Sequence, residues 1–187
     1  MIDVVINNYH FRTICERDII PFMELMTEWY GLEKMATPMD ELIDQRFQDH
    51  LTDKNTIYLM VFLKPEEQLV AVGSFQEVNL NPYYLGCIVA KPFRGMGLGT
   101  EIVRNLITIA HEHFPGKPLE AHIRKDNFAS QRVTEKCGGV QVRIQDAPEL
   151  EFYLDFLDRH KGESDFDFVS LQKAIREARD NILVYQV

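Results

Sequence analysis

Residues 83–99 read YYLGCIVAKPFRGMGLG, and this stretch decides the fold. Its first eight residues are largely apolar and β-prone, which is typical of a buried strand. Gly95, Gly97 and Gly99 alternate in the turn that follows, and apolar residues continue behind them at helical spacing. The residues on that helix face are Leu98, Ile102, Leu106, Ile109 and His113. The pattern predicts a strand, a glycine-rich turn and a helix in direct succession.

A glycine-rich turn at the start of a helix is suited to binding phosphate. The first backbone N–H groups of a helix have no partner within the helix, and the helix dipole is positive at that end. Glycine also lets the backbone approach an anion closely. A plain connection would not need three alternating glycines, because each costs about 0.5–1 kcal/mol in a helix or strand. We therefore expect residues 94–100 to form an anion-binding loop.

Two other phosphate-binding devices do not fit this loop. A P-loop needs Lys and then Ser or Thr after its last glycine, whereas Gly99 is followed by Thr100-Glu101. The dinucleotide fingerprint needs G-x-G-x-x-G, whereas this chain has G-x-G-x-G behind strands that look like antiparallel hairpins. Neither a P-loop nor a dinucleotide-binding turn is therefore expected.

Short strands and helices make up the rest of the chain. Alternating apolar patterns predict strands at 9–14, 56–63, 69–78, 119–123 and 140–144, with a hairpin connection at 64–68. Helical spacing predicts helices at 22–29 and 127–136, and another that begins at Thr37-Pro38. Phe152, Leu154 and Phe156 alternate and predict a last core strand. Beyond Gly162 an amphipathic helix is expected, with Phe168, Leu171, Ile175 and Ala178 on its apolar face.

The loop and its context resemble one enzyme family. The pattern [Gln/Arg]-x-x-Gly-x-[Gly/Ala], matched at 94–99, resembles the pyrophosphate loop of the GNAT acetyltransferase superfamily. Ile88-Val89-Ala90 lies at the usual offset upstream. Asn127 opens a short helix that ends in Cys137-Gly138-Gly139, as in the family. The resemblance covers roughly residues 9 to 144.

The resemblance implies an α+β fold in one domain over residues 1–187. It would have a mixed, mostly antiparallel sheet of six to seven strands, flanked by helices. The sheet would be splayed between its fourth and fifth strands, expected here at 83–90 and 119–123. Residues 162–187 would be a C-terminal helical extension. This extension is either an appendage to the same domain or a contact in a homodimer.

The resemblance also implies acetyl-CoA as co-substrate. Its pantetheine arm would insert between the splayed strands, and an N–H near Ile88 or Val89 would face the thioester carbonyl. Loop amides would hold the pyrophosphate, with Arg94 adding a cation, and Asn127 would lie on the pantetheine side. The expected cofactor-binding residues are Ile88, Val89, Arg94, Gly95, Met96, Gly97, Leu98, Gly99, Thr100, Asn127 and Ser130.

Direct attack on the thioester needs a neutral amine, so a group must remove a proton from it. Glu120 and His122 are candidates, because their i, i+2 spacing places them on one face of a strand. Glu77 is a third candidate, and all three could instead be ordinary outward-facing residues. Many family members carry a Tyr that protonates the leaving thiolate, where this chain has Thr134. Tyr83, Tyr84 or solvent could replace it, and we take Tyr84 as the candidate.

Composition limits the partners. The 187 residues carry a formal net charge of -9, which disfavours nucleic-acid binding. No apolar run is long enough for a membrane span, and the N-terminal residues do not read as a signal peptide. The three cysteines, Cys15, Cys87 and Cys137, show no disulfide or zinc spacing, which favours the cytoplasm. His111-Glu112-His113 predicts no metal, because side chains two apart on a helix diverge.

The acceptor is expected to be a small-molecule amine or a peptide amine. Acidic residues gather around the first two predicted helices, at Glu28, Glu33, Asp40, Glu41 and Asp44. They would suit a cationic acceptor, and a solvated helix face explains them equally well. The leading hypothesis is an acetyl-CoA-dependent N-acetyltransferase. The alternative is a catalytically silent acyl-CoA-binding sensor or interaction module.

Overall fold

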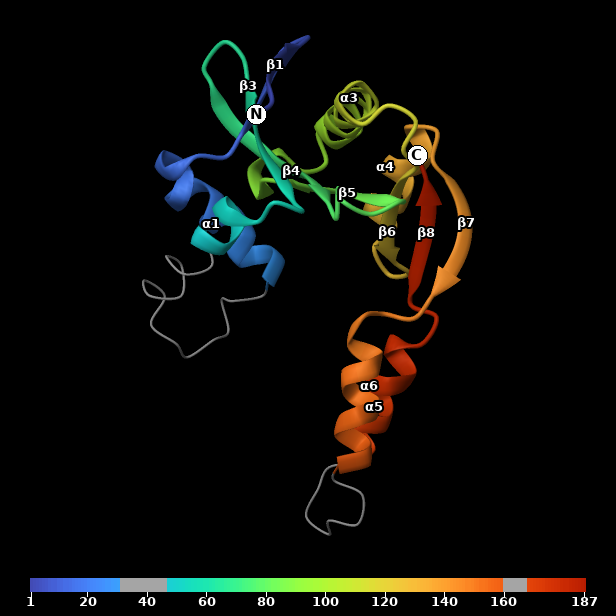
Figure 1. The fold of residues 1–187 in the computed structure, drawn as a ribbon. Helices are drawn as coiled ribbons and strands as arrows, with labels where there is room; N and C mark the ends of the chain where they lie inside the picture. The colour runs from blue at the N-terminus through green and yellow to red at the C-terminus, as the bar shows by residue number, and fades with distance from the viewer. Residues whose placement is uncertain (31–46, 160–167) are drawn as a thin grey trace. The chain divides into compact units, whose positions relative to one another are not determined.

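The computed structural model describes residues 1–30, 47–159 and 168–187 (Figure 1). The chain divides into two compact units, Met1–Glu120 and Ala121–Val187, and each is considered by itself. No helix in the described ranges is both long enough and apolar enough to cross a membrane. The helix predicted to begin at Thr37-Pro38 lies mostly outside the described residues.

The first unit is built on a row of antiparallel strands that follow the chain order. These strands are β1 (Asp3–Ile6), β2 (Tyr9–Thr13), β3 (Ile57–Leu63), β4 (Gln68–Gln76) and β5 (Tyr83–Val89). Short turns join β1 to β2 and β3 to β4, as expected for antiparallel neighbours. The predicted hairpin at 64–68 is confirmed by the pairing of Leu63 with Gln68. Strand β1 was not predicted.

Helices pack on the two faces of this sheet. Helix α1 (Ile19–Tyr30) and the helical residues 47–52 cover one face, where Phe22, Phe47 and Val72 belong to one buried cluster. Helix α3 (Leu98–His113) covers the other face with Ile102, Leu106 and Ile109, which are fully buried. Short 3₁₀ helices, Glu16–Asp18 and Lys91–Phe93, precede α1 and α3. The predicted strand–turn–helix succession at 83–113 is confirmed.

Strand β6 (Leu119–Arg124) runs parallel to β5 over a short stretch. The pairs are Tyr83 with Leu119 and Tyr84 with Glu120. The antiparallel ladder between β4 and β5 continues much further, to Ala71 opposite Val89. Within the described residues, the β5 edge that faces away from β4 is therefore paired only at its start.

The second unit contains the rest of β6, two antiparallel strands and three helices. These elements are α4 (Phe128–Lys136), β7 (Val140–Gln145), α5 (Glu149–Arg159), α6 (Phe168–Ala178) and β8 (Ile182–Gln186). The strand order is β1-β2-β3-β4-β5-β6-β8-β7, so the sheet has eight strands rather than the six to seven expected. The predicted α+β class with a mixed, mostly antiparallel sheet and flanking helices is confirmed.

The predicted strand at Phe152, Leu154 and Phe156 is wrong, because these residues lie in α5. Phe152 is 60% exposed and Leu154 is 41% exposed, so their alternation does not mark a buried sheet face. The residues that pack are Leu150, Tyr153 and Leu157, which recur at helical spacing.

The predicted C-terminal helix is confirmed as α6, and its apolar face packs within its own unit. Leu171 and Ile175 join a buried cluster with Leu150 of α5. The chain then continues into β8, which was not predicted and which pairs antiparallel with β7. Residues 162–187 therefore contribute a strand to the sheet in addition to a helix.

Candidate functional site

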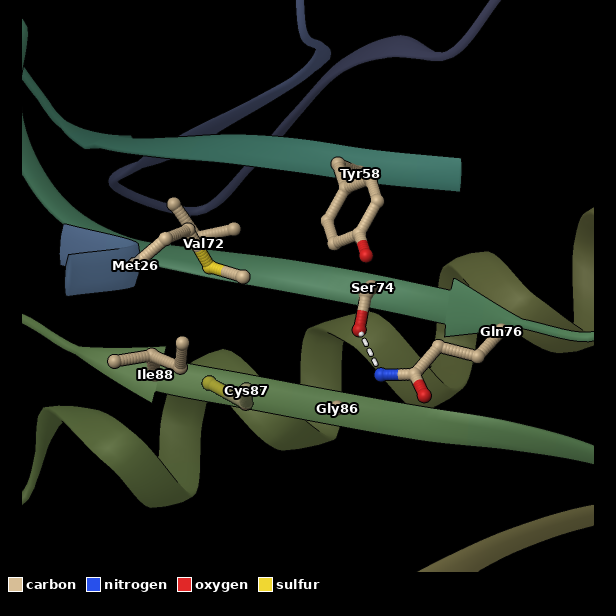
Figure 2. Close-up of a pocket in the computed structure, with 8 residues that line it drawn as sticks. All are labelled: Met26, Tyr58, Val72, Ser74, Gln76, Gly86, Cys87 and Ile88. Carbon is tan, nitrogen blue, oxygen red and sulfur yellow. Dashed lines mark hydrogen bonds between the residues drawn. The ribbon is translucent and has the colours of Figure 1, made fainter. Parts of the chain in front are cut away.

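The first unit contains a pocket of about 230 Å³ over β3, β4 and β5, on the face covered by α1 (Figure 2). Its lining residues are Met26, Tyr58, Val72, Ser74, Gln76, Gly86, Cys87 and Ile88. Figure 2 shows the apolar Met26, Val72 and Ile88 gathered at one end and the polar residues at the other. None of these eight residues, which are the lining residues in the described ranges, carries a formal charge.

Strand register explains why these side chains meet. Tyr58 lies opposite Ser74, and Ser74 lies opposite Gly86, so the three form one row across three strands. Residues two further along each strand share the same face. Gln76 therefore lies on the pocket face opposite Tyr84, and Tyr84 in turn pairs with Glu120. This second row of Gln76, Tyr84 and Glu120 lies on the same face of the sheet as the pocket and ends at a carboxylate.

Ser74 and Gln76 form a polar pair on β4. The Gln76 Nε2 donates to Ser74 Oγ at 2.9 Å, and Ser74 is 5% exposed. Gly86 makes room for this pair. A Cβ placed on Gly86 would lie 2.4 Å from Ser74 Oγ and 2.9 Å from Gln76 Nε2. Both distances are below van der Waals contact, so any larger residue at 86 would displace the pair.

The glycine-rich loop follows β5 in the same unit. Gly95 and Gly97 have φ values of +77° and +84°, in the left-handed region that favours glycine. A Cβ on either residue would meet no atom within 4 Å, so backbone conformation rather than crowding requires these glycines. Gly97 is the N-cap of α3, and no side chain caps the helix there. The first backbone N–H groups of α3 therefore have no side-chain acceptor from the N-cap residue.

Arg94 ties the loop back to the strand. Its Nε donates to the Val89 carbonyl oxygen at 2.8 Å, while the residue as a whole is exposed. Met96 is 65% exposed. Leu98, Gly99 and Thr100 form the first turn of α3. The loop therefore presents a cation and exposed backbone amides, which is the arrangement that binds phosphate oxygens.

The proposed proton-transfer residues lie in different surroundings. Glu120 is 7% exposed and lies in register with Tyr84, on the pocket face. Tyr83 points to the opposite face, beside Phe75 and Phe114, where burial raises its pKa to about 12. Of the two tyrosines, Tyr84 is therefore the one in the pocket row.

Glu77 lies just beyond the end of β4, exposed and with a φ of +54°. Gln76, its neighbour, lines the pocket instead. His122 is half-buried on β6, and its Nδ1 lies 3.4 Å from Gln145 Nε2. The pocket lining thus includes neither Glu77 nor His122.

Residues of the second unit that were predicted to contact the cofactor have clear local roles. The Asn127 Oδ1 accepts from the Ser130 backbone N–H at 3.1 Å, which makes Asn127 the N-cap of α4. Thr134 is 5% exposed. A Cβ on Gly139 would lie 2.5 Å from Thr134 Cγ2, so this threonine packs tightly against the turn behind α4.

Sequence reasoning did not select Ser74, Gln76 or Gly86. Two signals were present: a glycine inside an otherwise apolar strand, and two polar residues at i, i+2 in the preceding strand. Only the register connects these two signals. In the described ranges, no group of three His, Cys, Asp or Glu side chains is placed to hold a metal ion.

Residues 9–140 match the acetyltransferase (GNAT) domain family, and the chain therefore belongs to this family. The resemblance stated above is confirmed, and family membership supports acyltransferase activity. Over 95 residues the chain is 27% identical to the probable N-acetyltransferase YjcK of Bacillus subtilis (strain 168). That stretch is 49% of this chain and 52% of the relative, so the match spans about half of the relative's length.

Solved structures share the fold at low sequence identity. A spermidine N-acetyltransferase from Vibrio cholerae, crystallised with CoA and spermine, superposes with a TM-score of 0.67 at 13% identity. The superposition covers 96% of this chain and 95% of that one. A putative ribosomal-protein-serine acetyltransferase from Vibrio cholerae gives 0.66 at 14% identity, over 100% and 97% of the two chains.

Proposed function

We propose that this protein is an N-acetyltransferase. It transfers the acetyl group of acetyl-CoA to the primary amine of a small molecule or a peptide, by direct attack. One observation carries the proposal: a single strand, β5, forms the pocket floor with Gly86 and Ile88 and then leads into the anion-binding loop. A thioester held by its diphosphate at that loop would extend along β5 towards the pocket.

The β5 ladder supplies the hydrogen-bond donors that this geometry needs. The Ala90 N–H donates to the Val70 carbonyl on β4 at 2.8 Å. Hydrogen bonding alternates along an antiparallel strand, so the N–H groups of Leu85, Cys87 and Val89 point to the opposite edge. The Ile88 N–H points to β4, which favours Val89 over Ile88 among the two amides predicted. Donors on this edge would pair with pantetheine and stabilise the oxyanion, a contribution of about 2.7–4 kcal/mol per donor.

The reaction requires two proton movements. An amine with a pKa near 10 must first lose a proton, and Glu120 is our candidate to accept it because it lies on the pocket face. The neutral amine then attacks the thioester carbonyl, and the tetrahedral intermediate collapses to an amide and CoA thiolate. Tyr84 or solvent would protonate the thiolate. His122 and Glu77 stay alternative bases. Acetyl-CoA is the co-substrate, with Asn127 predicted on the pantetheine side and Ser130 predicted as a further cofactor-binding residue.

The direct test is release of free thiol from acetyl-CoA in the presence of a panel of amines. Gly97→Val tests the loop, because a β-branched residue at a φ of +84° would disrupt it. We expect CoA binding to be lost in calorimetry while the domain stays folded. Gly116→Val is the matched control, since Gly116 has a φ of +75° and equally open surroundings away from the loop. Equal CoA affinity in the two variants would remove the loop from the proposal.

The base is tested by the pH dependence of the rate. Glu120→Gln should abolish the acid limb of the kcat/KM profile if Glu120 accepts the proton. His122→Ala should leave that limb in place. An unchanged profile in both variants would assign proton removal to Glu77 or to water.

A second candidate function is a catalytically silent acyl-CoA sensor. The lining residues that the structure describes include no carboxylate or imidazole, and Thr134 occupies the position where many family members carry a Tyr. Saturable CoA binding without turnover across the amine panel would favour this function. For either function we propose the cytoplasm as location, because the three cysteines form no disulfide.

A further inference from the structure

The described residues that line the pocket next to the proposed transfer site carry no formal charge, and this constrains the acceptor. We propose that the acceptor is an amine that carries a carboxamide a few atoms from its reactive nitrogen, rather than a second cation or a carboxylate. The inference rests on the proposed acetyl transfer and names the substrate class of that site. It distinguishes this chain from the spermidine N-acetyltransferases that share its fold.

The Ser74–Gln76 pair carries the inference. Within the described residues, the 2.9 Å bond from Gln76 Nε2 to Ser74 Oγ is the only hydrogen bond that either side chain makes. The Ser74 hydroxyl hydrogen is then left as a donor, and the Gln76 Oε1 is left as an acceptor. A donor and an acceptor side by side match the C=O and N–H of one carboxamide. A lone ammonium offers only donors and a carboxylate only acceptors.

Burial makes this match selective. Ser74 is 5% exposed, and the other lining groups that surround it include Tyr58 and the apolar Val72 and Ile88. A charged group that entered would lose its hydration, and none of the eight described lining residues supplies an opposite charge to compensate. A neutral amide loses less hydration free energy on entering the pocket, and its two hydrogen bonds to Ser74 and Gln76 compensate for that loss. Sites that hydrogen-bond a substrate group discriminate against analogues that lack it.

The position of the Ser74–Gln76 pair relative to β5 sets the distance between the carboxamide and the reactive nitrogen of the acceptor. Ser74 Oγ and Gln76 Nε2 lie over Gly86, as the short distances from a Cβ at 86 show (Figure 2). The N–H groups proposed to face the thioester lie on the far edge of the same strand. Neighbouring strands are ~4.8 Å apart, so the carboxamide and the reacting nitrogen are separated by roughly one strand width. Gly86 allows the acceptor to pass between them.

In the part of the chain that the structure describes, the row of paired strand residues that begins at Gln76 contains one carboxylate, Glu120, and it lies outside the pocket lining. Glu120 is two strands beyond Gln76 in the same row, with Tyr84 between them. Two strand spacings amount to ~9.6 Å, so Glu120 is placed to serve the reacting amine rather than the Ser74–Gln76 end. The acidic residues predicted to favour a cationic acceptor, such as Asp40 and Glu41, lie outside the described residues.

The experiment compares acceptors of equal length that differ in one terminal group. The probes are δ-aminovaleramide, cadaverine and δ-aminovalerate, and the shorter set glycinamide, ethylenediamine and glycine. Thiol release from acetyl-CoA gives kcat/KM for each. We expect the carboxamide to exceed its diamine and its carboxylate by at least about tenfold in one of the two sets. Adding leucinamide and a leucyl tripeptide amide distinguishes a small-molecule acceptor from a peptide amino terminus.

Gln76→Glu is the decisive variant, because it keeps the side-chain shape and adds a negative charge. It should lower kcat/KM for the carboxamide about tenfold or more and raise it for the diamine. Gln68→Glu is the matched control, since Gln68 is exposed at the other end of β4. If Gln76→Glu does not fold, Ser74→Ala replaces it and should lower only the carboxamide rate.

The possible outcomes separate the two proposals. A wild-type preference for the diamines, or an unchanged preference in Gln76→Glu, overturns the carboxamide inference and leaves acetyl transfer intact. Absence of thiol release with every amine overturns the proposed function. In that case binding decides the inference: δ-aminovaleramide should raise the melting temperature of the wild type and not of Gln76→Glu, and no shift in the wild type overturns it.

Discussion

Two glycines lie inside strands of the first unit, one facing each side of the sheet, and they have different structural roles. Gly73 on β4 faces α3, and a Cβ there would lie 2.7 Å from Leu106 Cδ2. Gly86 on β5 faces the pocket, and a Cβ there would lie 2.4 Å from Ser74 Oγ. Gly73 allows α3 to pack closely on the sheet, whereas Gly86 leaves space above β5 for the Ser74 and Gln76 side chains.

The neighbour of each glycine decides its role. Leu106 is fully buried, so it has little space to move away from a side chain at 73. Ser74 and Gln76 border a pocket of about 230 Å³, so they can move if a side chain appears at 86. We infer that steric crowding on the α3 face lowers the free energy of unfolding, whereas crowding on the pocket face lowers activity.

Gly86→Ala should give the largest effect and should act on activity. The added methyl group displaces the Ser74–Gln76 pair by about 1 Å, and a misplacement of that size can lower the rate about a hundredfold. Steady-state kinetics with the best acceptor measures kcat/KM, and calorimetry measures CoA affinity. CoA affinity and melting temperature should stay close to wild type. A loss of stability with unchanged kinetics would contradict a role for Gly86 at the site.

Gly73→Ala should lower stability and leave the kinetics of the folded protein close to wild type. Overpacking against Leu106 is expected to cost about 1–3 kcal/mol, measured by urea unfolding. The double variant Gly73→Ala with Leu106→Ala should show a favourable coupling, because the smaller residue at 106 removes the crowding. Strict additivity of the two substitutions would show that Gly73 and Leu106 are not in steric conflict.

Much of this arrangement could be predicted from local sequence. The strands β3, β4 and β5 and helix α3 follow from apolar periodicity, and the loop at 94–99 follows from spacing within six residues. The pocket could not be predicted, because Gly86 and Ser74 meet only through strand register, which no local pattern specifies. The roles of Gly73 and Gly86 look alike in sequence, since both are single glycines inside apolar strands.

The errors have physical causes as well. Three alternating residues, Phe152 to Phe156, are too short a run to distinguish a strand from a helix. The helical spacing of Leu150, Tyr153 and Leu157 was the better signal, because those residues pack on α6. Strand β8 was missed because its five residues follow an amphipathic helix and are stabilised by pairing with β7.

Tyr9→Phe tests whether polar contacts on the α3 face affect stability alone. The Tyr9 hydroxyl donates to Glu101 Oε2 at 2.7 Å, which ties β2 to the first turn of α3, and burial raises the Tyr9 pKa. Losing this bond should cost about 1–2 kcal/mol in the free energy of unfolding, since Glu101 keeps access to solvent. Activity per folded molecule should not change. A selective loss of CoA affinity would show that Glu101 also orders the loop.

The smallest effect is expected at His10 on β2, the strand next to the edge strand β1. Its pH dependence gives a way to change stability without changing the pocket. Hydrogen bonds to Asp3 at 2.8 Å and to Glu67 at 3.1 Å raise the His10 pKa above its ordinary value near 6.5. A raised pKa in the folded state means that the protonated imidazole is stabilised by folding. This contribution is complete below the ordinary pKa and is lost as the pH rises through the folded-state pKa.

The melting temperature should therefore fall slightly as the pH rises above the ordinary histidine pKa of about 6.5, and His10→Asn should flatten that part of the profile. Glu67→Gln should reduce the slope without removing it, because the hydrogen bond to Asp3 is the larger cause of the shift. Relative acceptor preference should be the same in all three proteins, since His10 lies outside the pocket lining. A preference that changed with His10 would mean that β2 and the pocket are coupled. The contrast between Gly73 and Gly86 would then not separate effects on stability from effects on activity.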